Sequence, residues 1–201
     1  VNKIDCPEAR QVEREIDQMS ETVDRLLELA RMPGAPPFER GILDLVVLAD
    51  DVTLDLQSLA ASRGGNIRVV DRGPAVARGD YCTLREALRN LVANAILHHP
   101  DRPNVDIVCG PGATLCVDDD GRGVRGMTAH ALFEPFARGE TAAKGAGLGL
   151  AFVKRVIDLH LGTIMASTSP AGGARFIVVL IDGEPSGNVD DYGDAVGTPA
   201  E

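Results

Sequence analysis

From residue 41 onward the sequence alternates between segments with strand periodicity and segments with helix periodicity, and this order constrains the fold most strongly. We expect strands near 41–45, 66–70, 105–109, 114–118, 163–167 and 174–181, and helices near 47–61, 80–99 and 147–161. Strands separated by helices of different lengths, closing on a hairpin-like pair, are typical of a two-layer α/β sandwich.

A different pattern precedes this region. Residues 8–32 predict one helix, because apolar residues recur at spacings of 4, 3, 4, 3 and 4 and form a narrow seam between charged residues. The seam consists of Val12, Ile16, Met19, Val23, Leu26 and Ala30. Such a helix belongs to a bundle or dimerisation element or, alternatively, packs on its own domain. The proline-rich segment 33–39 ends it and predicts a domain boundary.

The charge balance restricts the class of partner. With 20 Lys and Arg against 30 Asp and Glu, the net charge is −10, which argues against nucleic acid and against direct contact with an anionic membrane. Half of this charge lies in residues 183–201, which we expect to be disordered. The four cysteines lack metal-ligand spacing, so we do not expect a zinc site. The abrupt polar start at Val1 suggests a piece of a longer protein.

Three polar side chains lie one turn apart on the helix predicted at 80–99. Asn90, Asn94 and His98 form a row beside a stripe of apolar residues, Leu84, Leu88, Leu91 and Ala95. Asn is only a middling helix former, so two of them on one face suggest a function. An amide oxygen can bind Mg²⁺ while the ion keeps waters and bridges phosphates. Two solvated surface amides are the alternative.

Two glycine-rich segments follow. The sequence DDGRG at 119–123 comes directly after an apolar strand, which places Asp119 at a strand end and Gly121 and Gly123 in a tight turn. A carboxylate there can accept a hydrogen bond from an exocyclic amine such as adenine N6, although a turn with solvated acids is the alternative. The sequence KGAGLGLA at 144–151 runs into a helix, whose first N–H groups can bind an anion.

In this order the segments resemble the catalytic and ATP-binding part of two-component sensor histidine kinases, members of the Bergerat-fold ATPase superfamily. The family's N, G1, F and G2 boxes resemble, respectively, NLVANA at 90–95, DDGRG at 119–123, LFEPFAR at 132–138 and GAGLGL at 145–150. The resemblance covers residues 8–181. It implies an α+β fold, a two-layer sandwich whose mixed sheet carries helices on one face, preceded by a helical hairpin segment.

The resemblance also divides the chain and assigns its ligands, ATP and Mg²⁺. It implies a partial dimerisation and phosphotransfer hairpin at 1–33, a linker at 34–39, an ATP-binding domain at 40–182 and the acidic tail at 183–201. Asn94 and Asn90 would hold Mg²⁺ and Asp119 the adenine amino group. The other residues implied at the nucleotide are His98, Gly121, Gly123, Phe136, Arg138, Lys144, Gly145, Gly147, Leu148 and Gly149. Phe133 and Phe136 would anchor a mobile lid.

Departures from the family pattern modify these expectations. Leu97 occupies a position that often holds Lys or Arg, and Ala174 replaces a Thr that supports the adenine site, so we expect weakened nucleotide affinity. No histidine precedes the N box, so the phosphoacceptor would lie outside this chain; we expect His99, His130 and His160 to be surface or helix-end residues. Asn90 stands where relatives such as gyrase have a water-activating Glu, and an amide is no general base.

The implied function is a protein-histidine kinase that transfers the γ-phosphoryl group of Mg-ATP to an imported histidine and hydrolyses ATP slowly. Autophosphorylation would require a histidine upstream of Val1. The alternative is a non-catalytic phosphorelay or interaction module with a degenerate ATPase fold. The implied partners are a response regulator receiver domain and a second copy bound through the hairpin. The implied location is cytoplasmic, at the cytosolic end of a membrane-anchored sensor.

Overall fold

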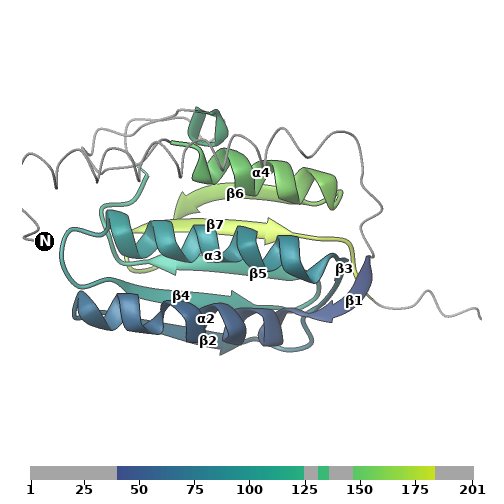
Figure 1. The fold of residues 1–201 in the computed structure, drawn as a ribbon, viewed down its shortest axis with the longest axis horizontal. Coiled ribbons are helices and arrows are strands. Elements are labelled where there is room, and N and C mark those ends of the chain that lie inside the picture. Colours follow the sequence, from purple (N-terminus) through teal and green to yellow (C-terminus); the bar gives the residue numbers. More distant parts are fainter. Residues whose placement is uncertain (1–39, 125–130, 136–146, 184–201) are drawn as a thin grey trace, which may run out of the picture.

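A computed structural model of the chain describes residues 40–124, 131–135 and 147–183 (Figure 1). Two strands, β1 (Gly41–Asp44) and β3 (Val76–Gly79), form a small antiparallel pair. The main sheet has the strand order β2-β4-β5-β7-β6. Its strands are β2 (Asn66–Asp71), β4 (Asn104–Cys109), β5 (Thr114–Asp119), β6 (Thr163–Thr168) and β7 (Ala174–Val179). The sheet is mixed, since β2 pairs with β4 in parallel and every other pairing is antiparallel.

Three helices cover one face of this sheet (Figure 1). They are α2 (Leu45–Ser62), α3 (Tyr81–His98) and α4 (Gly149–Leu159), and α3 packs against both of the others. A short 3₁₀ helix, η1 (Ala131–Phe133), contacts α4. The predicted α+β fold, a two-layer α/β sandwich with a mixed sheet and helices on one face, is therefore confirmed.

The core lies between the two layers. In β4, Val105, Ile107 and Cys109 are buried and alternate with Asp106 and Val108, which are half-buried on the side away from the helices. The predicted stripe of α3 is buried as expected, at Leu84, Leu88, Leu91 and Ala95. Burying each large aliphatic side chain contributes about 1.5–3 kcal/mol relative to exposure, so the stripe fixes which face of α3 turns to solvent.

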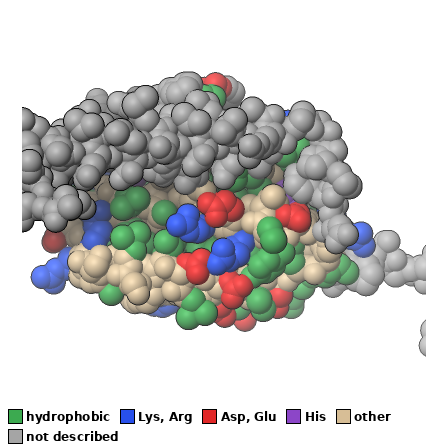
Figure 2. Space-filling view, viewed as in Figure 1, with side chains coloured by type: hydrophobic (Ala, Val, Ile, Leu, Met, Phe, Trp, Pro, Cys, Tyr) green, Lys and Arg blue, Asp and Glu red, His purple; other side chains and the backbone are tan. Residues whose placement is uncertain are grey.

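Side-chain caps begin two of the helices. The Asp44 carboxylate accepts a hydrogen bond from Val46 N at the start of α2, and that of Asp80 accepts from Thr83 N at the start of α3. The face that α2 and α3 present to solvent carries acidic and basic side chains together (Figure 2). Among them, Arg85 of α3 pairs with Asp55 of α2. No helix in the described part of the chain has the length and apolarity to cross a membrane.

The predicted elements in the described part of the chain are confirmed with shifts of one or two residues, whereas the strand β3 and the short η1 were missed. The strand β3 was not predicted, because it has only four residues, comes soon after Pro74 and contains Arg78 and Gly79. The hairpin segment 1–33 and the linker 34–39 lie outside the described residues, as does the tail from residue 184. Gly183 is still tied to the fold, since its N–H donates to Val76 O at 3.2 Å.

Candidate functional site

The polar row predicted on α3 is present. Asn90 is 4% exposed, and its amide nitrogen donates to the main-chain oxygen of Glu86 at 2.8 Å. That bond orients the amide within the helix. Asn94 follows one turn later and is half-buried. The expected alternative of two solvated surface amides does not apply, because Asn90 is buried.

The glycine-rich start of α4 lies directly against this row. A Cβ added to Gly149 would lie 3.4 Å from Asn94 Nδ2 and 3.5 Å from Asn90 Oδ1. Leu148 is 1% exposed and anchors the segment in the core, and Gly147 has φ +70°. Among the residues that the structure describes, no side chain caps this helix, so its first N–H groups have no side-chain acceptor there. Amide oxygens and free helix N–H groups thus meet at one place, which suits an anion held with a cation.

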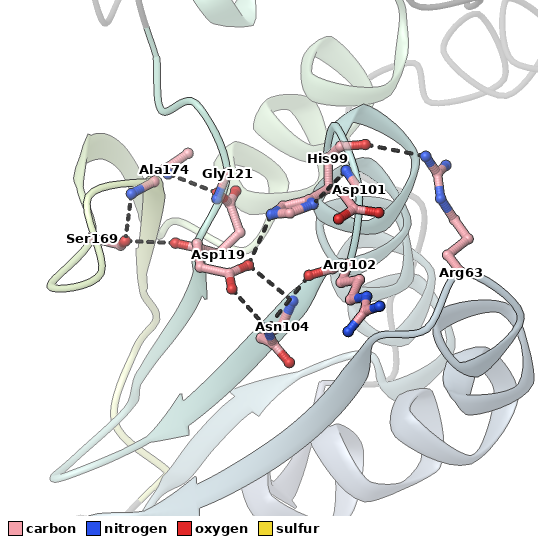
Figure 3. A network of polar contacts seen from close by, with 11 residues as sticks. Arg63, His99, Asp101, Arg102, Asn104, Asp119, Gly121, Ser169 and Ala174 are labelled. Atoms are coloured by element: carbon pink, nitrogen blue, oxygen red, sulfur yellow. Dashed lines mark hydrogen bonds and ion pairs between the residues drawn. The ribbon is translucent and has the colours of Figure 1, made fainter.

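At the other side of the site, Asp119 ends β5 (Figure 3). Its Oδ1 accepts hydrogen bonds from Gly121 N at 2.8 Å and from Ala174 N at 2.9 Å. Within the described residues, both of these side-chain hydrogen bonds end on Oδ1, so Oδ2 is the oxygen left for a ligand. Burial raises the pKa of Asp119. The hydrogen bonds from Ala174 and Gly121 act to lower it, but the net shift of the pKa is upward.

The hairpin between β6 and β7 holds the main chain of Asp119 through a hydrogen bond from Ser169. Ser169 Oγ donates to the main-chain oxygen of Asp119 at 2.6 Å and accepts from Gly173 N at 3.0 Å. Gly173 has no room for a side chain, because an added Cβ would lie 2.2 Å from Asp119 O. Gly123 has φ +69°, in the left-handed region that favours glycine. The hairpin and the turn at 119–123 therefore pack backbone against backbone.

Sequence reasoning missed a second polar cluster beside this turn, shown in Figure 3. His99 follows α3 as its C-cap residue, but its side chain is only 8% exposed, and Nε2 lies 3.0 Å from Asp120 Oδ1. Asn104 donates to the same carboxylate from its main-chain N at 2.9 Å and from Nδ2 at 2.7 Å. These residues are far apart in sequence, and only the HH pair at 98–99 offered a local signal.

Two residues at the end of α3, Leu97 and His98, occupy positions expected on the phosphate side of the site. Leu97 is 51% exposed, so the departure from a basic residue leaves an apolar side chain in solvent. Loss of hydration around the ring lowers the pKa of His98. His98 is therefore mainly neutral at pH 7, where it can donate a hydrogen bond without carrying a charge.

The other predicted residues divide in two groups. Phe133 packs edge to face on Phe176, with ring centroids 6.4 Å apart, so the described part of the F box is attached to the sheet. The remaining predicted contacts lie outside the described residues: Phe136, Arg138, Lys144 and Gly145. His160 is a helix-end residue as expected, at the C-cap of α4, but it is buried rather than on the surface.

The described residues hold no cluster of three or more His, Cys, Asp or Glu side chains suited to a metal ion. The donor set at Asn94 and Asn90 is neutral and small, so a closed protein cage for Mg²⁺ is not built here. It fits an ion that takes one protein oxygen and completes its shell with phosphate oxygens and waters. Of the two, Asn94 is the better candidate, since it is half-buried whereas Asn90 is only 4% exposed.

Comparisons with known proteins agree with this geometry. The family model for histidine kinase-, DNA gyrase B- and HSP90-like ATPases matches residues 79–184, just over half of the chain. The probable sensor histidine kinase TcrY of Mycobacterium tuberculosis is 35% identical over 192 residues, which cover 89% of this chain and 40% of TcrY. The chain spans less than half the length of these curated relatives, which include TcrY, BasS of Salmonella typhimurium and IrlS of Burkholderia pseudomallei.

Solved structures show the same fold. The ATP-binding domain of PrrB from Mycobacterium tuberculosis has a TM-score of 0.58 and 27% identity, covering 72% of this chain and 98% of that domain. Full-length ShkA, solved in complex with AMPPNP, has a TM-score of 0.73 at 23% identity, covering 90% of this chain and 41% of ShkA. At that identity the ShkA likeness concerns the fold.

Proposed function

This chain belongs to the histidine kinase-, DNA gyrase B- and HSP90-like ATPases and carries the ATP-binding catalytic domain of a sensor histidine kinase, and we propose that it transfers the γ-phosphoryl group of ATP to a histidine outside this sequence. The observation that carries the proposal is the placement of Asp119 at the end of β5 and of Asn94 against Gly149 at the start of α4. These provide an acceptor for a base and a set of groups for phosphates.

The base side selects adenine by hydrogen-bond polarity. Asp119 offers Oδ2 as an acceptor to the N6 amino group, while Oδ1 is fixed by Gly121 and Ala174. A guanine presents the O6 acceptor at that place, and a carboxylate would repel it. A site built around one satisfied hydrogen bond discriminates strongly against a ligand that lacks the matching group.

On the phosphate side, the N–H groups that begin α4 and the Asn94 amide lie together. Mg²⁺, when bound, would neutralise phosphate charge and be held by Asn94, with Asn90 as the supporting polar group. Arg138, Lys144 and Gly145 stay predicted phosphate contacts, as does Phe136 for the lid. His98, at the end of the row, likewise stays a predicted contact.

The reaction itself is a displacement at phosphorus. A nitrogen of the incoming imidazole forms a bond to the γ-phosphorus while the bond to the bridging oxygen of ADP breaks, and the bond electrons leave with ADP. Asn90 cannot remove a proton from water, because a neutral amide is not a base at this pH. The site therefore protects bound ATP from hydrolysis until the imidazole arrives.

Partners and place in the cell follow from the same proposal. A receiver domain of a response regulator would take the phosphoryl group from the histidine, and a second copy of the chain would pair through the helix predicted at 8–32. The ATP site would face the cytosol, at the inner end of a membrane-anchored sensor. The alternative of a non-catalytic module, suggested by Leu97 and Ala174, is not favoured, since the relatives are named as sensor histidine kinases.

Calorimetric titration of the whole chain with a non-hydrolysable ATP analogue and Mg²⁺ tests the proposal. We expect saturable binding, and about a tenfold or larger loss in Asp119→Asn, because one carboxylate acceptor becomes an amide. Asp106→Asn is the matched control, since Asp106 is a sheet carboxylate that pairs with the exposed Arg68. No binding at millimolar analogue, or equal effects of the two variants, would refute the assignment.

A further inference from the structure

His99 holds a fixed position at the end of α3 although the ATP site, as proposed above, does not use it. Its Nδ1 accepts a hydrogen bond from Asp101 N at 3.2 Å. A neutral imidazole with an accepting Nδ1 carries its proton on Nε2. Nε2 lies 3.0 Å from Asp120 Oδ1, but it is not aligned with that oxygen as a hydrogen bond. The imidazole therefore lies in close polar contact with the carboxylate next to Asp119.

The main chain of His99 is fixed as well. Arg63, the C-cap residue of α2, donates to Leu97 O at 3.2 Å and to His99 O at 3.1 Å (Figure 3). These two carbonyls are among the last of α3, which have no helical partner of their own. The guanidinium thus anchors the end of α3 to α2 and fixes the main chain that carries the ring.

Asp120 is in contact with polar groups on two sides. Besides the contact with His99, it accepts hydrogen bonds from both nitrogens of Asn104 at the start of β4. Partial burial acts to raise the pKa of Asp120, but the hydrogen bonds from Asn104 act against it, and the net shift of the pKa is downward. The carboxylate is therefore ionised at neutral pH, and hydrogen bonds to a charged acceptor are stronger than neutral ones.

The imidazole also borders the turn that carries Asp119. A Cβ added to Gly121 would lie 3.1 Å from His99 Cδ2 and 3.1 Å from Asp119 Oδ1, so the glycine fits between the ring and the carboxylate. Gly121 N in turn donates to that same Oδ1 at 2.8 Å. If the ring were lost, Asp120 and Gly121 could shift, and the carboxylate of Asp119 would shift with them.

We propose that His99 is a positioning residue for adenine recognition, which acts through Asp120 and Gly121 to hold the free oxygen of Asp119 at the place where the N6 amino group binds. The inference rests on the proposed function, because it presupposes that Asp119 reads the base. His99 itself does not touch the nucleotide. Its contribution is therefore to the selectivity for adenine over guanine, whereas Asn94 and the start of α4 act on phosphates that both nucleotides share.

Calorimetry on the whole chain with non-hydrolysable analogues of ATP and GTP, both with Mg²⁺, tests the inference. We expect His99→Ala to lower affinity for the ATP analogue by up to about tenfold and to leave that for the GTP analogue unchanged. His99→Gln should restore most of the loss, because its polar side chain can fill the same space beside Asp120 and Gly121. In an Asp120→Ala background, His99→Ala should cause only the smaller further loss transmitted through Gly121. Arg68→Ala, which breaks an exposed ion pair on β2, is the control.

Each possible result of this experiment either supports or overturns the inference. Native affinity and selectivity in His99→Ala would overturn the inference and leave the proposed function standing. An equal loss for both analogues, or a loss that His99→Gln does not restore, would show a merely structural role and also overturn it. A native chain that binds neither analogue would overturn both proposals. If circular dichroism shows His99→Ala to be unfolded, Asp120→Asn carries the test, with the same selective loss expected and its absence refuting the inference.

Discussion

Gly173 provides a sharp test of how closely the β6–β7 hairpin and the Asp119 turn pack. In Gly173→Ala the new Cβ would lie 2.2 Å from Asp119 O, 2.3 Å from Asp119 Oδ1 and 2.6 Å from Gly121 N. Real Cβ atoms essentially never come within 3.0 Å of such neighbours, and two of the three atoms are backbone, so the hairpin or the turn must move by most of an ångström. That shift would lengthen the bonds from Ser169 and Ala174 to Asp119.

The magnitude follows from these contacts. Overpacking costs about 1–3 kcal/mol, and each weakened hydrogen bond adds about 1 kcal/mol. With two bonds weakened, we therefore expect the free energy of unfolding in urea to fall by roughly 3–5 kcal/mol, and affinity for the ATP analogue to fall by more than about tenfold in the fraction that stays folded. Gly121→Ala, whose nearest contacts are 3.1 Å, should have a smaller effect. Gly41→Ala meets nothing within 4 Å and is the control. Equal stability and affinity in all three variants would refute the packing argument.

Two further predictions concern stability around α3. Buried His160 donates from Nδ1 to Val156 O and accepts from Asp80 N, and desolvation lowers its pKa, so the folded state resists a proton that the unfolded chain binds below pH 6.5. The stabilisation that comes from keeping His160 neutral should be complete above pH 6.5 and be lost as the pH falls from there toward the lower folded pKa. Urea unfolding at several pH values, of the native chain and of His160→Gln, measures this: the free energy of unfolding should depend less on pH in the variant. Asp80→Ala removes the carboxylate that accepts from Thr83 N at 2.8 Å, and should lower the free energy of unfolding by about 1–2 kcal/mol, with Asp80→Asn close to native; no difference between Ala and Asn would contradict the cap.

The layers of this fold could be predicted because its main elements obey local rules. The helix α3 shows its buried stripe in sequence, and the segment of β4 is recognisable there as a short strand. The strand order could not be predicted, because the parallel pairing of β2 with β4 joins segments across a whole helix. Likewise β3 is recognised only through its pairing with β1, a contact that no local pattern reveals.

Site residues could be predicted where they belong to a sequence motif, but not where only tertiary contacts bring them to the site. Asn90 and Asp119 belong to segments whose order along the chain is distinctive. His99 and His160 do not, and both were expected at the surface or at helix ends. Each does lie at a helix end, yet each side chain is buried, because residues distant in sequence pack on it: Gly79 and Asp80 on His160, and Asp120 and Gly121 on His99. Burial at a helix end depends on which distant segments pack there, which is a property of the tertiary fold.

Ala174 shows how a departure in one side chain need not remove the interaction it normally supports. The expected Thr hydroxyl at this position is absent, but the Ala174 main-chain N still donates to Asp119 Oδ1 at 2.9 Å. A hydroxyl also reaches Asp119 from the opposite end of the hairpin, since Ser169 Oγ donates to its main-chain oxygen. The two bonds hold the backbone and one carboxylate oxygen of Asp119 without the Thr. The expected loss of affinity should then come chiefly from Leu97 on the phosphate side, and Leu97→Lys should raise ATP affinity more than Ala174→Thr.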